Sequence, residues 1–238
     1  MRIDKEKCIA CGKCALYCPV DAMIVREGYL EIDYDECTEC YNCKRQNVCP
    51  TDALYQEELE WPRTIRSILS DVLSVAEESQ ISGRGTEEMK TNEVTGRFKP
   101  GEAGIAIELG RPVVGTRMYD VEKVTKAIAD IEGIEFEDEN PVTSLIKNKK
   151  TGEFKKEVLN EKSLSAIIEI KIPQNKVLEV IKRLENVEKE IESVFSLDVC
   201  SKVNENNEIP TKKIVKEAGY WISPNGKTNI GLGKPKVI

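Results

Sequence analysis

Eight of the nine cysteines in this 238-residue chain fall in two runs near its amino end. In each run three thiols recur at steps of three residues, and a fourth cysteine, followed at once by proline, comes a little later. Three thiolates on such a tightly turning loop can bind three corners of an iron–sulfur cube, while the fourth lies too far along the chain to close the same cube and reaches a second one. The two runs are Cys8, Cys11, Cys14, Cys18-Pro19 and Cys37, Cys40, Cys43, Cys49-Pro50.

Two other uses of clustered cysteines compete with this interpretation. A disulfide framework suits a small secreted protein, but no charged and apolar leader opens the chain, so we expect a cytoplasmic protein. Cys₄ zinc sites also use Cys-x₂-Cys units, usually as two well-separated knuckles. Each run here instead has three thiols at equal steps and ends in Cys-Pro. The spacing therefore favours iron–sulfur clusters.

Residues 1–56 resemble the bacterial-type ferredoxins that carry two [4Fe–4S] clusters. The resemblance rests on the eight cysteines and the two Cys-Pro pairs, and it departs from the family pattern because five residues, not three, separate Cys43 from Cys49. It implies electron transfer at low potential in an anaerobic or microaerobic setting. The ligand sets that it implies are Cys8, Cys11, Cys14 and Cys49 for the first cluster and Cys37, Cys40, Cys43 and Cys18 for the second.

The composition narrows the possible functions further. A formal net charge of −7 and the lack of a basic block argue against binding to the backbone of a nucleic acid. The longest apolar runs are far shorter than a membrane-spanning helix, so we expect no membrane partner. The chain contains no histidine, which excludes metal sites with histidine ligands and any catalytic pair that uses an imidazole.

A bridging region at residues 59–100 is expected to follow a ferredoxin-type domain at residues 1–58. Pro62 can open a helix, and apolar residues at steps of three and four predict that it spans about residues 62–79. Glycine- and arginine-rich sequence then continues to residue 118. Glycine lets the backbone approach a ligand closely, and arginine offers a planar donor fork to a carboxylate or phosphate. The alternative is an ordered surface segment with ordinary salt bridges. A small anionic ligand would use Arg84, Arg97, Arg111 and Arg117.

Residues 101–238 carry a β-α-β pattern twice, followed by a carboxyl-terminal extension. The pattern predicts strands at 104–114, from 134, at 164–172 and at 194–203, with helices at about 120–131 and 175–191 and a hairpin at 147–152. This order predicts an antiparallel sheet with both helices on one face. We therefore expect an α+β fold, in which the ferredoxin module precedes a split βαβ (βαββαβ-like) sandwich.

Three functions are compatible with the sequence. We favour an iron–sulfur electron-transfer protein whose appended α+β domain docks a redox partner protein or binds a substrate, because a freely diffusing carrier would not need such an appendage. The second is a redox enzyme or enzyme subunit that binds a small anionic substrate at the arginine-rich segment. The third is a ligand sensor that uses the clusters as a redox gauge or as structural staples. A cluster held by four thiolates has no open coordination position, which favours an electron-transfer component over a stand-alone enzyme.

Overall fold

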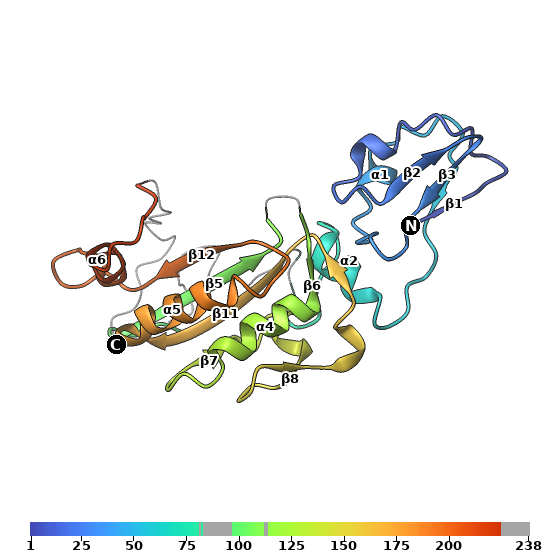
Figure 1. Ribbon diagram of the computed structural model, residues 1–238. Helices are drawn as coiled ribbons and strands as arrows, with labels where there is room; N and C mark the ends of the chain where they lie inside the picture. The colour runs from blue at the N-terminus through green and yellow to red at the C-terminus, as the bar shows by residue number, and fades with distance from the viewer. Residues whose placement is uncertain (81, 83–96, 112–113, 225–238) are drawn as a thin grey trace.

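The computed structural model describes residues 1–80, 82, 97–111 and 114–224. Figure 1 shows a small amino-terminal module, whose last strand is β4 (Leu54–Tyr55), at one end and a second domain built on a long sheet at the other, with helix α2 (Thr64–Ser70) between them. The module contains β1 (Arg2–Ile3), η1 (Ala15–Tyr17), β2 (Met23–Arg26), β3 (Tyr29–Ile32), α1 (Asn42–Arg45) and β4 (Leu54–Tyr55). The second domain contains β5 (Glu102–Leu109), β6 (Thr116–Arg117), α4 (Met118–Ile128), β7 (Glu135–Phe136), η2 (Thr143–Leu145), β8 (Ile146–Asn148), β9 (Glu153–Phe154), η3 (Lys156–Val158), β10 (Lys162–Ser163), β11 (Ala166–Pro173), η4 (Gln174–Lys176), α5 (Val177–Val187), β12 (Phe195–Cys200) and α6 (Pro210–Glu217).

Short antiparallel strand pairs frame the amino-terminal module. Strands β1 and β4 pair with Ile3 opposite Leu54, so the start of the chain lies beside the segment that follows the second cysteine run. Strands β2 and β3 form a hairpin whose turn contains Gly28 at a φ of +81°. A module of this length can bury little apolar surface, so it depends on further cross-links for its stability. Its buried core residues are Met1, Cys14, Met23, Leu30, Cys43 and Leu54.

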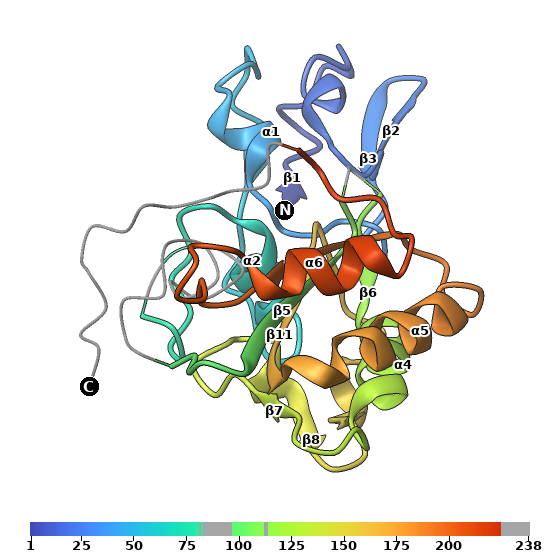
Figure 2. The ribbon, with the colours of Figure 1, turned by 90° about the vertical axis from the view of Figure 1, so that its left-hand side faces the viewer.

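The second domain is built on a four-stranded antiparallel sheet in the order β12-β5-β11-β7. Alternate residues of the two central strands point to one face, because successive side chains in a strand alternate. Helices α4 and α5 lie side by side along this sheet and contribute apolar side chains to the same core (Figures 1 and 2). The strand residues on the core side, all fully or almost fully buried, are Ala103, Ile105, Ile107 and Leu109 in β5 and Ala166, Ile168, Ile170 and Ile172 in β11.

The chain order of these elements is β5-α4-β7 and then β11-α5-β12. Neither unit keeps its two strands adjacent: β11 lies between β5 and β7, and β5 lies between β11 and β12. Each crossover helix therefore spans a strand of the other unit, which interleaves the two halves around one core. The assignment of the domain to the split βαβ class, and the domain boundaries that go with it, stay predictions.

Helix α2 is shorter than the sequence predicts. We expected it to span about residues 62–79, but it ends at Ser70, because Asp71 has an extended backbone and its carboxylate accepts a hydrogen bond from the Leu73 amide at 2.9 Å. Ile65 and Leu69 are 4% and 0% exposed and pack into the core of the second domain. Beyond the end of the helix Val72, Leu73 and Val75 are exposed, whereas Ala76 is buried.

The remaining predicted elements lie at the edges of the second domain. Strands β8 and β9 form a hairpin at the predicted position, and helix α6 packs near β12 and α5. Residues 225–238 of the carboxyl-terminal extension lie outside the described residues. Among the described residues, no helix is both long enough and apolar enough to cross a membrane.

Candidate metal centres

Two thiol-lined pockets lie inside the amino-terminal module. Each has about 320–340 Å³ of empty space, part of it open to solvent. The structure brings Cys49 of the second run into the first pocket and Cys18 of the first run into the second pocket, which is the exchange that the spacing predicts. The thiols are Cys8, Cys11, Cys14 and Cys49 around the first pocket and Cys18, Cys37, Cys40 and Cys43 around the second.

Matching backbone conformations turn the two runs in the same way. Left-handed φ angles recur at equivalent positions: 70° at Gly12 and 64° at Tyr41, each between the second and third cysteines of its run. Such angles are uncommon for non-glycine residues, so Tyr41 must be held there by its surroundings. The other matched pairs are Ala10 at 52° with Glu39 at 54°, and Asp21 at 52° with Asp52 at 50°.

One aspartate before each cysteine run connects that run to the segment that follows the fourth cysteine of the other run. The Asp4 carbonyl accepts a hydrogen bond from the Cys8 amide at 3.0 Å, and the Asp4 amide donates to the Ala53 carbonyl at 2.8 Å. The bonds from Cys37 to Asp33 and from Asp33 to Ala22 repeat this pattern at 2.9 and 2.7 Å. Because Ala53 and Ala22 follow the fourth cysteine of each run, these bonds bring that cysteine beside the other loop. Our sequence reasoning missed these residues, although Ile-Asp and Cys-Pro-x-Asp-Ala each occur twice.

Backbone amides point at the two exchanged thiols. The amide of Ala22 donates to Cys18 Sγ at 3.2 Å, and the amide of Ala53 donates to Cys49 Sγ at 3.2 Å. Burial acts to raise the pKa of Cys49, but hydrogen bonds from Ala53 and from Thr51 together lower it. A donor to sulfur favours the thiolate, which is the form that binds metal.

Burial has the opposite effect on the central thiols. It raises the pKa of Cys43 to about 12 and also raises the pKa values of Cys14, Cys37 and Cys40. These thiols are therefore neutral at pH 7 unless a metal replaces their protons. Cys11 differs from them because it is exposed.

The four thiols of each set fit a cluster better than a single ion. Thiolates around one zinc ion converge to about 2.3 Å from a point. Here each set instead surrounds a pocket of several hundred Å³, and apolar side chains such as Leu30 and Leu54 line the first one. Among the described residues, no three His, Cys, Asp or Glu side chains are grouped closely enough for one ion.

The longer interval between Cys43 and Cys49 contains the end of helix α1 and a left-handed residue, Asn47, at a φ of 51°. Its side chains make contacts of their own, because Lys44 pairs with Asp52 and Arg45 pairs with Asp71 at the end of α2. The additional residues therefore help to hold α2 while leaving both thiol sets in place.

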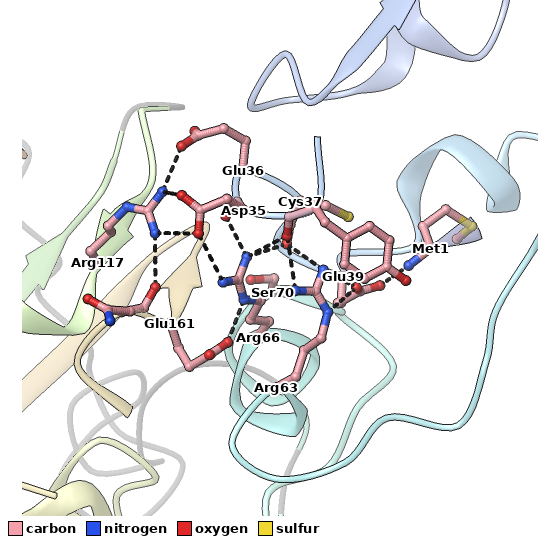
Figure 3. A network of polar contacts seen from close by, with 12 residues as sticks. Met1, Asp35, Glu36, Cys37, Glu39, Arg63, Arg66, Ser70, Arg117 and Glu161 are labelled. Atoms are coloured by element: carbon pink, nitrogen blue, oxygen red, sulfur yellow. Dashed lines mark hydrogen bonds and ion pairs between the residues drawn. The ribbon is translucent and has the colours of Figure 1, made fainter. Parts of the chain in front are cut away.

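The loop before the second run, residues 34–37, contacts helix α2 (Figure 3). Arg66 Nη1 donates hydrogen bonds to the carbonyl oxygens of Tyr34, Asp35 and Cys37 at 3.3, 2.6 and 2.8 Å. The Arg66 side chain is only 4% exposed. This contact places the second pocket, rather than the first, against the α2 side of the molecule.

Two basic residues of the second domain hold the acidic side chains of the same loop. Arg117 Nη2 lies 2.7 Å from both Asp35 Oδ2 and Glu36 Oε1, and Lys162 pairs with Glu36. The hydrogen bond from Arg117 lowers the pKa of Asp35, and the one from Lys162 is the main cause of the lowered pKa of Glu36. Both carboxylates are therefore charged at pH 7.

The arginines of the predicted anion site do not present free guanidinium groups in the described residues. Arg84 lies outside those residues, and each of the other three has carboxylate partners. A ligand would have to displace these partners, so the anion site stays a prediction. The partners are Glu137 for Arg97, Glu108 for Arg111, and Asp35 and Glu36 for Arg117.

The comparison with known proteins decides what the module is. A family model described as a 4Fe-4S dicluster domain matches residues 1–55. A ferredoxin-like protein of the vnf region of Azotobacter vinelandii is 34% identical over 59 residues, 24% of this chain and 91% of that protein. The chain belongs to the ferredoxin family through this module. The predicted resemblance is thus confirmed for the amino-terminal segment.

Pyruvate synthase subunits PorD are also similar to the ferredoxin module. The subunit from Methanocaldococcus jannaschii is 42% identical over 53 residues, and the one from Thermotoga maritima is 45% identical over 53 residues, in both cases 22% of this chain. The chain spans 59% and 52% of the lengths of these two relatives. No solved structure matches the chain. The comparisons show an iron–sulfur, electron-transferring type of module, and they do not extend to the second domain.

Proposed function

We propose that this protein is an electron-transfer component in which the ferredoxin module carries two [4Fe–4S] clusters. The observation that carries the proposal is the pair of pockets, each surrounded by three thiols of one run and one thiol of the other. The first cluster would be held by Cys8, Cys11, Cys14 and Cys49, and the second by Cys37, Cys40, Cys43 and Cys18.

The residues around the pockets have separable roles in this function. Bound clusters supply one-electron redox chemistry, and four thiolates apiece leave no position for a substrate. Leu30 and Leu54 at the first pocket, and Met23 and Ile32 at the second, exclude water from the thiols. The exposed Cys11 leaves the first site close to the surface, where an external redox protein can approach it.

We propose that the second domain determines which redox protein the module serves. The PorD relatives are named as subunits of pyruvate synthase, which supports a role for this chain as one component of a larger oxidoreductase. Arg66, Arg117 and Lys162 fasten the second domain to the module, so that the module is held beside it rather than free to diffuse.

The proposal is tested by cluster content and reducibility. Anaerobically purified or reconstituted full-length protein should contain about eight iron and eight sulfide per chain, four of each for a cluster. Dithionite should reduce it by two electrons, with the spectrum of interacting clusters in EPR. Zinc in place of iron, about four iron per chain, or no reduction by dithionite would contradict the proposal.

A further inference from the structure

A buried charge pair lies within the second cysteine loop. Glu39, between Cys37 and Cys40, is 0% exposed. Its carboxylate accepts a hydrogen bond from Arg63 Nε at 2.7 Å and also pairs with the amino group of Met1 (Figure 3). Arg63 precedes helix α2 directly, so this end of α2 supplies one of the two positive charges that balance Glu39, and the amino group of Met1 supplies the other.

Arg66 brings a second buried charge to this loop. Its guanidinium group donates to the carbonyl oxygen of Cys37, a residue of the second thiol set, and its other side faces Glu161 of the second domain. Arg66 thus bonds directly to the backbone of the thiol loop on one side and to Glu161 on the other, so the positive member of the Arg66–Glu161 pair is the one that contacts this loop. With 4% of the Arg66 side chain exposed, water screens this charge weakly.

The first loop has no counterpart of these charges in the described part of the chain. The position equivalent to Glu39 is Ala10, which carries no charge. No guanidinium group of the described residues is bonded to the backbone of residues 5–8. The two sites therefore differ in their electrostatic surroundings although their thiols are arranged alike.

The second domain reaches the second pocket from another side as well. Val20, which lines that pocket, lies 3.6 Å from where a Cβ atom would stand on Gly115. The residues of the second domain thus contact the ferredoxin module where the second cluster would bind.

We infer that Arg63 and Arg66 are positioning residues that raise the reduction potential of the second cluster, so that the α2 region tunes one of the two clusters. The inference rests on the proposed function. Reduction of a cluster by an external one-electron donor adds one negative charge and neither makes nor breaks a covalent bond. A nearby positive charge stabilises the reduced form more than the oxidised form, and net charge and hydrogen bonding are established determinants of cluster potential.

The experiment is a potentiometric titration of full-length protein followed by EPR, with dithionite as reductant. Arg66→Gln should lower one of the two midpoint potentials. At the original midpoint, the ratio of reduced to oxidised cluster should fall about tenfold, which corresponds to about 59 mV for one electron. Arg63→Gln should lower the same potential, and Glu39→Gln should raise it.

Two further variants separate charge from structure. Arg66→Lys keeps the positive charge but loses the planar guanidinium group, which weakens the hydrogen bonds to the carbonyl oxygens of Tyr34 and Asp35. Because the charge remains, this variant should retain most of the original reduction potential. Arg183→Gln removes an ion-paired arginine of α5 that contacts Asp130 and Glu179, and it should change neither potential.

The outcomes distinguish this inference from the proposed function. Two intact clusters with unchanged potentials in Arg66→Gln would overturn the inference alone, as would Arg66→Lys behaving like Arg66→Gln. If Arg66→Gln fails to retain both clusters, the other two variants test the inference. It requires that Arg63→Gln lower the potential of one cluster and that Glu39→Gln raise it, and it is overturned if neither potential changes. A native protein that never holds two clusters would overturn the proposed function itself.

Discussion

The hydroxyl group of Tyr119, in the first turn of α4, donates a hydrogen bond to Glu192 Oε2 at 2.7 Å. Glu192 lies just before β12, so this hydrogen bond connects the first turn of α4 to the segment that leads into the edge strand β12. The hydrogen bond to Glu192 is the main cause that raises the pKa of Tyr119 to about 12, and partial burial adds to it. The charge of one residue thus becomes linked to the stability of the second domain.

We predict that Tyr119 makes the stability of the second domain fall at high pH. Below about pH 10, the unperturbed tyrosine value, both the folded and the unfolded state keep the proton and the bond contributes fully. Between about pH 10 and 12 the unfolded state loses the proton first, so the contribution is lost as the pH rises through the folded-state pKa.

The free energies of unfolding of wild type and Tyr119→Phe, measured with urea from about pH 8 to 11.5, check this prediction. The difference between the two proteins should shrink as the pH rises, because phenylalanine cannot ionise. A difference that stays constant over this range would show that the hydrogen bond to Glu192 does not raise the pKa of Tyr119 in the folded state.

At the scale of elements, close backbone contacts fix how the β8–β9 hairpin packs on α4. Gly152, in the turn of this hairpin, has a φ of +70°, and its carbonyl accepts a hydrogen bond from the buried Thr125 hydroxyl at 2.7 Å. A Cβ atom at Gly152 would lie 2.4 Å from the carbonyl carbon of Thr125, which belongs to the helix backbone and cannot move aside cheaply. Glycine is therefore required twice, by the turn and by the contact.

Replacement of this glycine should destabilise the second domain strongly. We expect Gly152→Ala to lower the free energy of unfolding by roughly 2–6 kcal/mol, the sum of left-handed strain and displacement of α4. Gly101→Ala is the matched control, because Gly101 also has a positive φ, of +89°, but has nothing within 4 Å of the added atom. The control should cost only the strain, roughly 1–3 kcal/mol. Equal losses in chemical denaturation would mean that the contact with α4 is unimportant.

At the scale of the whole molecule, the ferredoxin module and the second domain meet at one of the two thiol sets. Residues 34–37 lead into the second set, and their carbonyl and carboxylate groups are bound by α2, β6 and β10. Stability of the second loop and docking of the second domain are thus expected to depend on each other.

Cysteine variants at equivalent positions should reveal this dependence. Cys14 and Cys43 are the third thiols of their runs and are 8% and 7% exposed, so alanine removes a similar contact from each set. We expect Cys43→Ala to speed amide hydrogen exchange in residues 64–70 by on the order of tenfold, because the carbonyls that bind Arg66 lose their support. Cys14→Ala should affect these amides much less. Mass spectrometry of both variants measures the effect, and equal exchange in α2 would argue against a preferential link to the second set.

Part of the molecule could be predicted from local sequence patterns. The family of residues 1–55 followed from cysteine spacing, because ligands of one cube must lie within a few residues of each other on a turning loop. Period-two and period-3.6 apolar patterns likewise predicted β11 and α5, since such patterns reflect which face of a strand or helix is buried. Helix α2 was predicted too long because Val72 and Val75 continue its apolar spacing, and spacing alone does not show that Asp71 leaves the helical conformation.

The thiols, their spacing and their family are properties of the sequence itself, because they depend on residues close together along the chain. The tertiary structure decided the rest. Arg117 meets Asp35 across 82 positions and Lys162 meets Glu36 across 126, and no local pattern encodes such pairs. The same long-range packing gives Arg117 carboxylate partners within the chain. It also places buried charges beside one thiol set that have no counterpart beside the other among the residues that the structure describes.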